Sequence, residues 1–187
     1  MLKHGIERDL GFFDNTGMVS TNLVVYLDAR NTDSYPGSGT LWTDISGNGN
    51  DGTLTNGPTY SSTDGGYINL DGSNDYVSLG SKSIITSNTF TFEYYTIFSY
   101  GGYISGGWLF QRPGDGGDPL RFGFNGTNLY NTATTFNTTG AWRHMVVSVS
   151  SGIPQAVFIN NVSSALTGSG TVSITNPKTI EIGRRTD

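Results

Sequence analysis

The stretch Thr89–Phe98 reads TFTFEYYTIF and decides the fold class. One parity along the chain is shared by four of its rings: Phe90, Phe92, Tyr94 and Phe98. A period of two places these rings on one face of a β-strand and the intervening residues on the other. We therefore predict a half-buried strand here, with Glu93 on the face opposite Phe92.

The same reading extends to both sides of this stretch. Trp142–Ser150 (WRHMVVSVS) and Gln155–Asn160 (QAVFIN) predict a pair of strands joined by a short turn through Gly152 and Pro154. Asn22–Asp28 (NLVVYLD) is a short apolar run, typical of a strand covered on both faces. Further strands are predicted at Gly66–Leu70, Asp75–Leu79, Gly107–Gln111, Leu120–Phe124, Thr171–Ile174 and Thr179–Ile182.

Turn signals separate these strands, such as Asn48-Gly49, Asp71-Gly72 and Asn125-Gly126. The chain has 187 residues, a length that suits one domain, and it shows neither an internal repeat nor a convincing helix. Many short strands with frequent turns predict an all-β fold in which two antiparallel sheets pack as a sandwich or jelly roll.

Composition excludes several classes of function. A net charge of −5 without a lysine run argues against nucleic-acid binding. The absence of cysteine removes disulfides, thiol catalysis and zinc–thiolate sites. Met1–Leu10 (MLKHGIERDL) does not read as a signal peptide, and no segment has the run of about 20 apolar residues that a membrane span needs.

Residues 1–21 differ from the rest because charged side chains concentrate there. We predict an N-terminal arm or edge element over 1–21, followed by one domain over 22–187. The alternative is a strand that closes one of the sheets.

Several runs together resemble a known family. LVVYLDA (Leu23–Ala29), the stretch Ser34–Tyr60 and GGYINLDGSNDYVSL (Gly65–Leu79) resemble the laminin-G-like branch of the concanavalin-A-like jelly rolls. AWRHMVVSVS (Ala141–Ser150), VFINN and IEIGRR continue the likeness as far as Arg185. The resemblance implies a two-sheet jelly-roll sandwich.

Two departures from the family stand out. Family members usually carry a further closing strand, so we expect either the N-terminal arm to replace it or the chain to be a shortened form. The hairpin reads Asn160-Asn161 where Asn-Gly is usual, and asparagine tolerates the left-handed angles that the turn needs.

SYPGSGTLWTDISGNGNDGTLTNGPTY (Ser34–Tyr60) resembles versions of the family found in virion proteins of tailed bacteriophages. That likeness implies a non-enzymatic capsid decoration, fibre or tail-associated protein, assembled in the host cytoplasm into the virion. It would contact other virion proteins through residues 1–20, and it is compatible with a homo-oligomer and with adhesion to a host-surface glycan. The alternative is a carbohydrate-binding module, calcium-assisted or not, of a cell-surface or secreted protein.

Catalysis is not expected. The relatives include glucanases, and retaining glycosidases need two carboxyl groups about 5 Å apart. The glutamates Glu7, Glu93 and Glu181 form no such pattern on a strand. We expect Glu93 to be a satisfied or half-exposed strand carboxylate and His144 to be structural.

The predicted glycan site lies around SYGGYISGGW. Exposed rings beside polar groups suit a saccharide, and the candidates are Tyr100, Tyr103, Trp108, Arg112, Asp115 and Asp118. In the alternative, Trp108 is a core residue and the two tyrosines pack a loop. Trp42 and Trp142 are both expected in the core.

No cofactor is required, but calcium is a candidate because it takes carboxylate, amide and carbonyl oxygens. Asp115 and Asp118 in GDGGDP are weak candidates for a calcium site. The loop DISGNGNDG (Asp44–Gly52) offers Asp44, Asn48, Asn50 and Asp51. In glycine-rich turns such side chains more often bond to their own backbone.

Overall fold

The computed structural model describes residues 22–71, 73–82, 84, 86–96, 104–105, 109–111, 119–124, 127–135, 142–171 and 178–183. Over these residues the protein is almost entirely β, and every strand pair is antiparallel. The predicted fold class, an all-β antiparallel sandwich, is therefore confirmed. The proposed arm, residues 1–21, lies outside the described residues, so the division into arm and domain stays a prediction.

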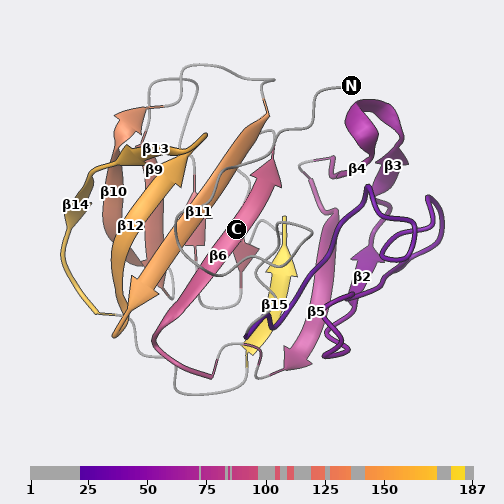
Figure 1. Cartoon of the computed structure of the whole chain (residues 1–187), viewed down its shortest axis with the longest axis horizontal. Coiled ribbons are helices and arrows are strands. Elements are labelled where there is room, and N and C mark those ends of the chain that lie inside the picture. Colours follow the sequence, from indigo (N-terminus) through magenta and orange to yellow (C-terminus); the bar gives the residue numbers. More distant parts are fainter. Residues whose placement is uncertain are drawn as a thin grey trace.

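One four-stranded sheet carries the strands around the opening stretch, in the order β13-β12-β11-β6. Its strands are β6 (Phe90–Thr96), β11 (Arg143–Ser150), β12 (Ile153–Ile159) and β13 (Val162–Ser164). We call it the front sheet, because in Figure 1 it lies in front of β9 and β10.

Two other sheets and a ribbon complete the described part of the fold. One sheet has the order β14-β10-β9-β8: β8 (Leu109–Gln111), β9 (Pro119–Phe124), β10 (Thr127–Thr135) and β14 (Leu166–Gly168). The other has the order β1-β2-β5-β15-β7: β1 (Leu41–Trp42), β2 (Gly52–Thr55), β5 (Tyr76–Lys82), β7 (Ile104–Ser105) and β15 (Lys178–Ile182). β3 (Thr59–Ser61) and β4 (Tyr67–Asn69) form the ribbon around a single 3-10 turn, η1 (Thr63–Gly65).

The inner face of the front sheet is apolar. On β11, Met145, Val147 and Val149 are buried, and they pair in register with Tyr94, Phe92 and Phe90 of β6. The predicted alternation of Thr89–Phe98 is thus confirmed within β6, where residues 91, 93 and 95 are exposed and those between them are not.

A second cluster fills the space between the five-stranded sheet and the ribbon. Its buried members are Tyr35, Leu54 and Val77, and Trp42 and Tyr60 pack against them. Trp42 therefore lies in the core, as its sequence context predicted.

The prediction of a strand at Asn22–Asp28 is wrong, because no ladder forms there. Its backbone groups are instead bonded by side chains of the loop Asp44–Gly52: the Asn48 and Asn50 amides donate to the carbonyls of Leu23 and Val24 at 2.7 and 2.8 Å. Polar loop side chains thus replace the neighbouring strand that the apolar run seemed to require.

The two hairpins of the front sheet use left-handed residues. Ser151 and Gly152 (φ 52° and 76°) form the turn between β11 and β12, and Pro154 lies inside β12 beside a bulge rather than in the turn as predicted. Asn160 and Asn161 (φ 49° and 65°) close the next turn, so the tolerance predicted for the Asn-Asn pair is confirmed.

Of the remaining predicted strands, all but one match an observed strand, and the exception lies mostly outside the described residues. Those at 66–70, 75–79, 107–111, 120–124 and 179–182 match β4, β5, β8, β9 and β15. Of Thr171–Ile174 only Thr171 is described, and it is not in a strand. β10 (TNLYNTATT) was missed because its many Thr and Asn residues read as loop. Within the described residues, no helix is long and apolar enough to cross a membrane.

Candidate functional site

The outer face of the front sheet presents polar and aromatic side chains where its inner face is apolar. On β6 these are Glu93 and Tyr95, and on the neighbouring β11 the polar residue is His144, with Val146 as an apolar neighbour on the same face. The register pairs His144 with Tyr95 and Val146 with Glu93, so the four residues form one continuous patch. On β12, Phe158 pairs with Val146 and leaves an exposed ring beside them.

His144 and Glu93 lie diagonally across the two strands and are bonded to each other. The Nε2 atom of His144 lies 2.8 Å from Oε1 of Glu93. The imidazole is buried, with 8% of its side chain exposed, while the Glu93 side chain is 54% exposed. Glu93 is therefore the half-exposed, satisfied carboxylate that the sequence predicted, and its outer surface remains available to solvent.

Tyr95 is the exposed ring of this patch. It stacks on His144 with ring centroids 4.5 Å apart and planes only 14° from parallel, yet the residue is 55% exposed. The buried imidazole supports one face of the phenol ring and fixes its orientation. A flat ring held in this way is suited to contact a ligand without losing much conformational entropy.

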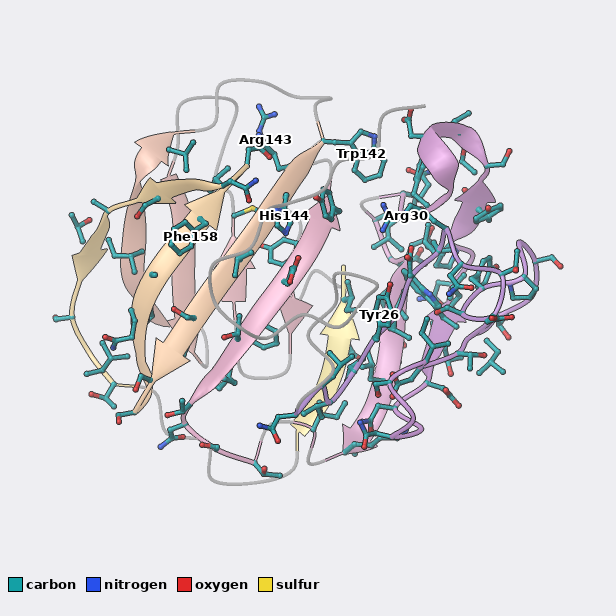
Figure 2. All side chains as sticks on the ribbon, viewed as in Figure 1. Tyr26, Arg30, Trp142, Arg143, His144 and Phe158 are labelled. Carbon is teal, nitrogen blue, oxygen red and sulfur yellow. The ribbon has the colours of Figure 1, made fainter. Side chains whose placement is uncertain are left out.

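The segment Asn22–Arg30 supplies the other side of the patch. Figure 2 shows Tyr26 and Arg30 beside β6, on the side away from β11. The Arg30 guanidinium donates two hydrogen bonds to the Asp28 carboxylate, at 3.0 and 3.3 Å, and its Cζ lies 6.0 Å from the centre of the Tyr95 ring. Arg30 is 59% exposed and so keeps donor groups open to solvent.

The hydrogen-bond pattern fixes the charge state of these groups. Burial acts to raise the pKa of Asp28, but side-chain and backbone hydrogen bonds from Arg30 outweigh it and hold that pKa below its usual range. Burial, followed by the nearby Asp28 carboxylate, raises the pKa of Tyr26, whose hydroxyl donates to Asp28 Oδ2 at 3.3 Å. Asp28 is thus an ionised acceptor with its donors already in place.

Trp142 does not lie in the core, and that prediction is wrong. It is half-buried at the start of β11, where its Nε1 donates to Asp64 Oδ2 at 3.1 Å and its ring meets Tyr67 edge to face at 5.3 Å. The indole therefore joins the front sheet to the η1 turn. An indole carries a polar N–H group, so a tryptophan can lie at the edge of a core with that group bonded to a polar partner. The family resemblance does not distinguish this position from the core, and the prediction for Trp142 failed for that reason.

The predicted glycan site falls on residues that the structure does not describe. Tyr100, Tyr103, Trp108, Arg112, Asp115 and Asp118 all lie outside the described residues, so that site and its calcium alternative stay predictions.

The loop Asp44–Gly52 uses its acidic and amide groups internally. The Asp44 carboxylate accepts bonds from the backbone N–H groups of Tyr26, Ser46 and Asn50, and Asp51 accepts from the Asp44 N–H. This is the turn-forming role that the sequence favoured over calcium binding. In the described part of the chain no cluster of three His, Asp or Glu side chains has the arrangement of a metal site.

The sequence predicts the face of Glu93 correctly but indicates no partner for His144. The missing signal was parity: His144 has the opposite parity to the buried Met145 and Val147, just as Glu93 does to Phe92. Both are outward-facing residues of adjacent strands, and only the register between the strands brings them together.

Comparison with known proteins supports the fold. No family model matches the chain, and a search of curated proteins finds no match. Among solved structures, domain 4 of AbnA, a GH43 extracellular arabinanase from Geobacillus stearothermophilus in complex with arabinotriose, is similar. The TM-score is 0.54 and the identity 19%, over 75% of this chain and 77% of that one. The protein is a jelly-roll-like β-sandwich domain.

Proposed function

We propose that this protein is a non-catalytic carbohydrate-binding domain and that it binds glycan on the outer face of the front sheet. The observation that carries the proposal is the exposed Tyr95 ring, which is supported from below by His144 and flanked by Glu93 and Arg30. Glycan sites need this combination, because the apolar face of a sugar packs on a ring while its hydroxyl groups bond to polar side chains.

The structural neighbour adds support of a different kind. That domain was solved in complex with arabinotriose, and it shares this fold at low identity. The likeness therefore favours glycan binding as a use of the fold, while the position of the site here rests on the residues of this chain.

The absence of catalysis is part of the proposal. Glycoside hydrolysis uses two carboxyl groups that face each other across the bond to be broken. The exposed carboxylate of the patch, Glu93, is bonded to an imidazole, and Asp28 is bonded by a guanidinium. Neither is arranged as the general acid of a pair.

The virion role implied by the sequence resemblance stays a prediction. It rests on the amino-acid sequence of Ser34–Tyr60, and none of the comparisons bears on it. Glycan binding would fit such a protein if it served adhesion to a host surface, and the same binding would fit a module of a secreted or cell-surface protein.

The test is glycan binding by the wild type and by Tyr95→Ala. Affinity electrophoresis in gels that contain arabinan, galactan, xylan or β-glucan should retard the wild type in at least one of them. A bound sugar that covers the exposed half of the Tyr95 ring removes about 50–100 Å² of apolar surface from water. Removal of this ring in Tyr95→Ala should therefore weaken binding about tenfold.

Two further variants make this result interpretable. Val162→Ala, an exposed apolar side chain at the far edge of the same sheet, should migrate like the wild type. Tyr95→Leu still covers His144 but lacks the flat ring, so it should lose binding without a loss of stability. Undiminished retardation of Tyr95→Ala would contradict the proposed site.

A further inference from the structure

The charged side chains around Tyr95 are already bonded within the patch. Arg30 Nε lies 3.0 Å from Asp28 Oδ1, and His144 Nε2 lies 2.8 Å from Glu93 Oε1. Each acid therefore has a basic partner, and the pairs come from opposite sides of the ring.

Among the described residues, two further charged groups near this patch are also bonded. Asp64 accepts a hydrogen bond from the Trp142 indole, and Arg143 donates to the Trp142 carbonyl oxygen at 3.2 Å. Figure 2 shows Arg143 at the end of the front sheet, beyond His144 and away from Arg30.

The patch as a whole carries no excess of positive charge. Whichever form the His144 imidazole takes, the two pairs together are neutral or negative. An acidic sugar at the outer N–H groups of Arg30 would meet a guanidinium whose charge is already balanced by Asp28, which accepts two guanidinium N–H groups and a backbone N–H. The chain's net charge of −5 adds a long-range repulsion of polyanions.

We infer that the front-sheet patch selects neutral glycans and discriminates against uronate- or sulfate-bearing ones. This inference rests on the proposed function and adds the class of ligand. The exposed oxygens of Glu93 accept hydrogen bonds from sugar hydroxyls, and the outer N–H groups of Arg30 donate to sugar oxygens. Because no net charge is neutralised on binding, affinity does not depend on ionic strength.

The first experiment compares an acidic polymer with its neutral ester and with other neutral polymers. Calorimetric titration of the full chain would use polygalacturonate, its methyl ester, and a neutral panel of arabinan, galactan, xylan and β-glucan. We expect a neutral polymer to bind with a Kd that changes less than about twofold between about 0.05 and about 0.5 M salt. Polygalacturonate should bind at least tenfold more weakly than the best neutral polymer.

The outcomes separate the two proposals. Tighter binding of the acidic polymer, or a Kd that rises steeply with salt, would overturn the inference of neutral ligands and leave glycan binding intact. No binding to any polymer would overturn the proposed function itself. Neither result depends on a variant that has to fold.

A charge variant tests whether the Arg30–Asp28 ion pair causes this selectivity. Asp28→Asn keeps the shape of the side chain but leaves the Arg30 cation uncompensated, so binding of polygalacturonate should improve about fivefold at low salt and return to the wild-type value at high salt. Asp33→Asn changes net charge by the same amount at an exposed site three residues after Arg30 and should have no such effect. Equal behaviour of the two variants would show that the ion pair does not set selectivity.

Discussion

Replacing Asp44 with asparagine should destabilise the protein more than any other single-atom change in the loop Asp44–Gly52. Its Oδ1 accepts the N–H groups of Tyr26 and Ser46 at 2.8 and 2.9 Å, and its Oδ2 accepts the Asn50 N–H and the Ser46 hydroxyl, both at 2.9 Å. In Asp44→Asn one oxygen becomes an NH₂ group that faces a fixed backbone N–H donor. That donor, in a buried site, loses its acceptor.

The magnitude follows from the number of bonds. One charge-assisted bond is lost and the others become neutral, which should cost about 2–3 kcal/mol of unfolding free energy. For a domain of this size that corresponds to a melting temperature lower by about 4–12 °C. Asp33→Asn, at an exposed position, should stay within about 0.5 kcal/mol of the wild type.

The pH dependence gives an independent check. Burial acts to raise the pKa of Asp44, but the hydrogen bonds from backbone N–H groups and Ser46 prevail and lower it. A lowered folded-state pKa means that the stabilisation is present above the unfolded-state pKa of about 3.9 and is lost as the pH falls through the folded-state value. The difference between wild type and Asp44→Asn should therefore be constant from pH about 7 to about 5 and shrink below about 4. Thermal melts at several pH values measure it, and a deficit below about 1 kcal/mol at neutral pH, or one that persists in acid, would refute the reasoning.

Two further stability predictions concern glycine conformation and core packing. Gly66→Ala should lower the free energy of unfolding by about 3 kcal/mol or more, because at φ 119° its Cβ would lie 2.7 Å from the Tyr60 hydroxyl. Gly39→Ala is also at positive φ but has open space around it, so it should lower that free energy by about 1 kcal/mol. Urea denaturation measures both, and equal losses would contradict the contact argument. Met145→Ala, at a fully buried side chain, should cost about 2–5 kcal/mol, and Val162→Ala, 68% exposed, less than about 0.5 kcal/mol. Similar melting temperatures for these two variants would contradict the assignment of the inner face.

The front sheet was predictable because its signal is local. β6 alternates large apolar residues with others along its length, and β11 places Met145, Val147 and Val149 two positions apart. The turns on both sides of β12 carry residues that accept left-handed angles. The segment Asn22–Asp28 was not predictable in the same way. Its apolar run is real, but its hydrogen-bond partners are amides and a carboxylate some twenty residues further on, and no local pattern encodes such bonds.

The site was only half predictable for a related reason. The parity of Glu93 follows from its own strand, whereas its bond to His144 depends on the register between strands about 50 residues apart in sequence. A shift of one residue would have placed the imidazole on the other face. The Tyr100–Asp118 candidates were chosen by composition, and they stay a separate prediction from the patch around Tyr95.

The most direct test of the central claim is an amide NMR titration of the ¹⁵N-labelled chain with the oligosaccharide of whichever neutral polymer retards it. We predict that shift changes cluster on Glu93–Thr96 of β6, on Arg143–Val146 of β11 and around Arg30, and that Tyr95→Ala removes them. Changes confined to other parts of the chain, such as the stretch Tyr100–Asp118, would show that glycan binds elsewhere and would contradict the site proposed on the front sheet.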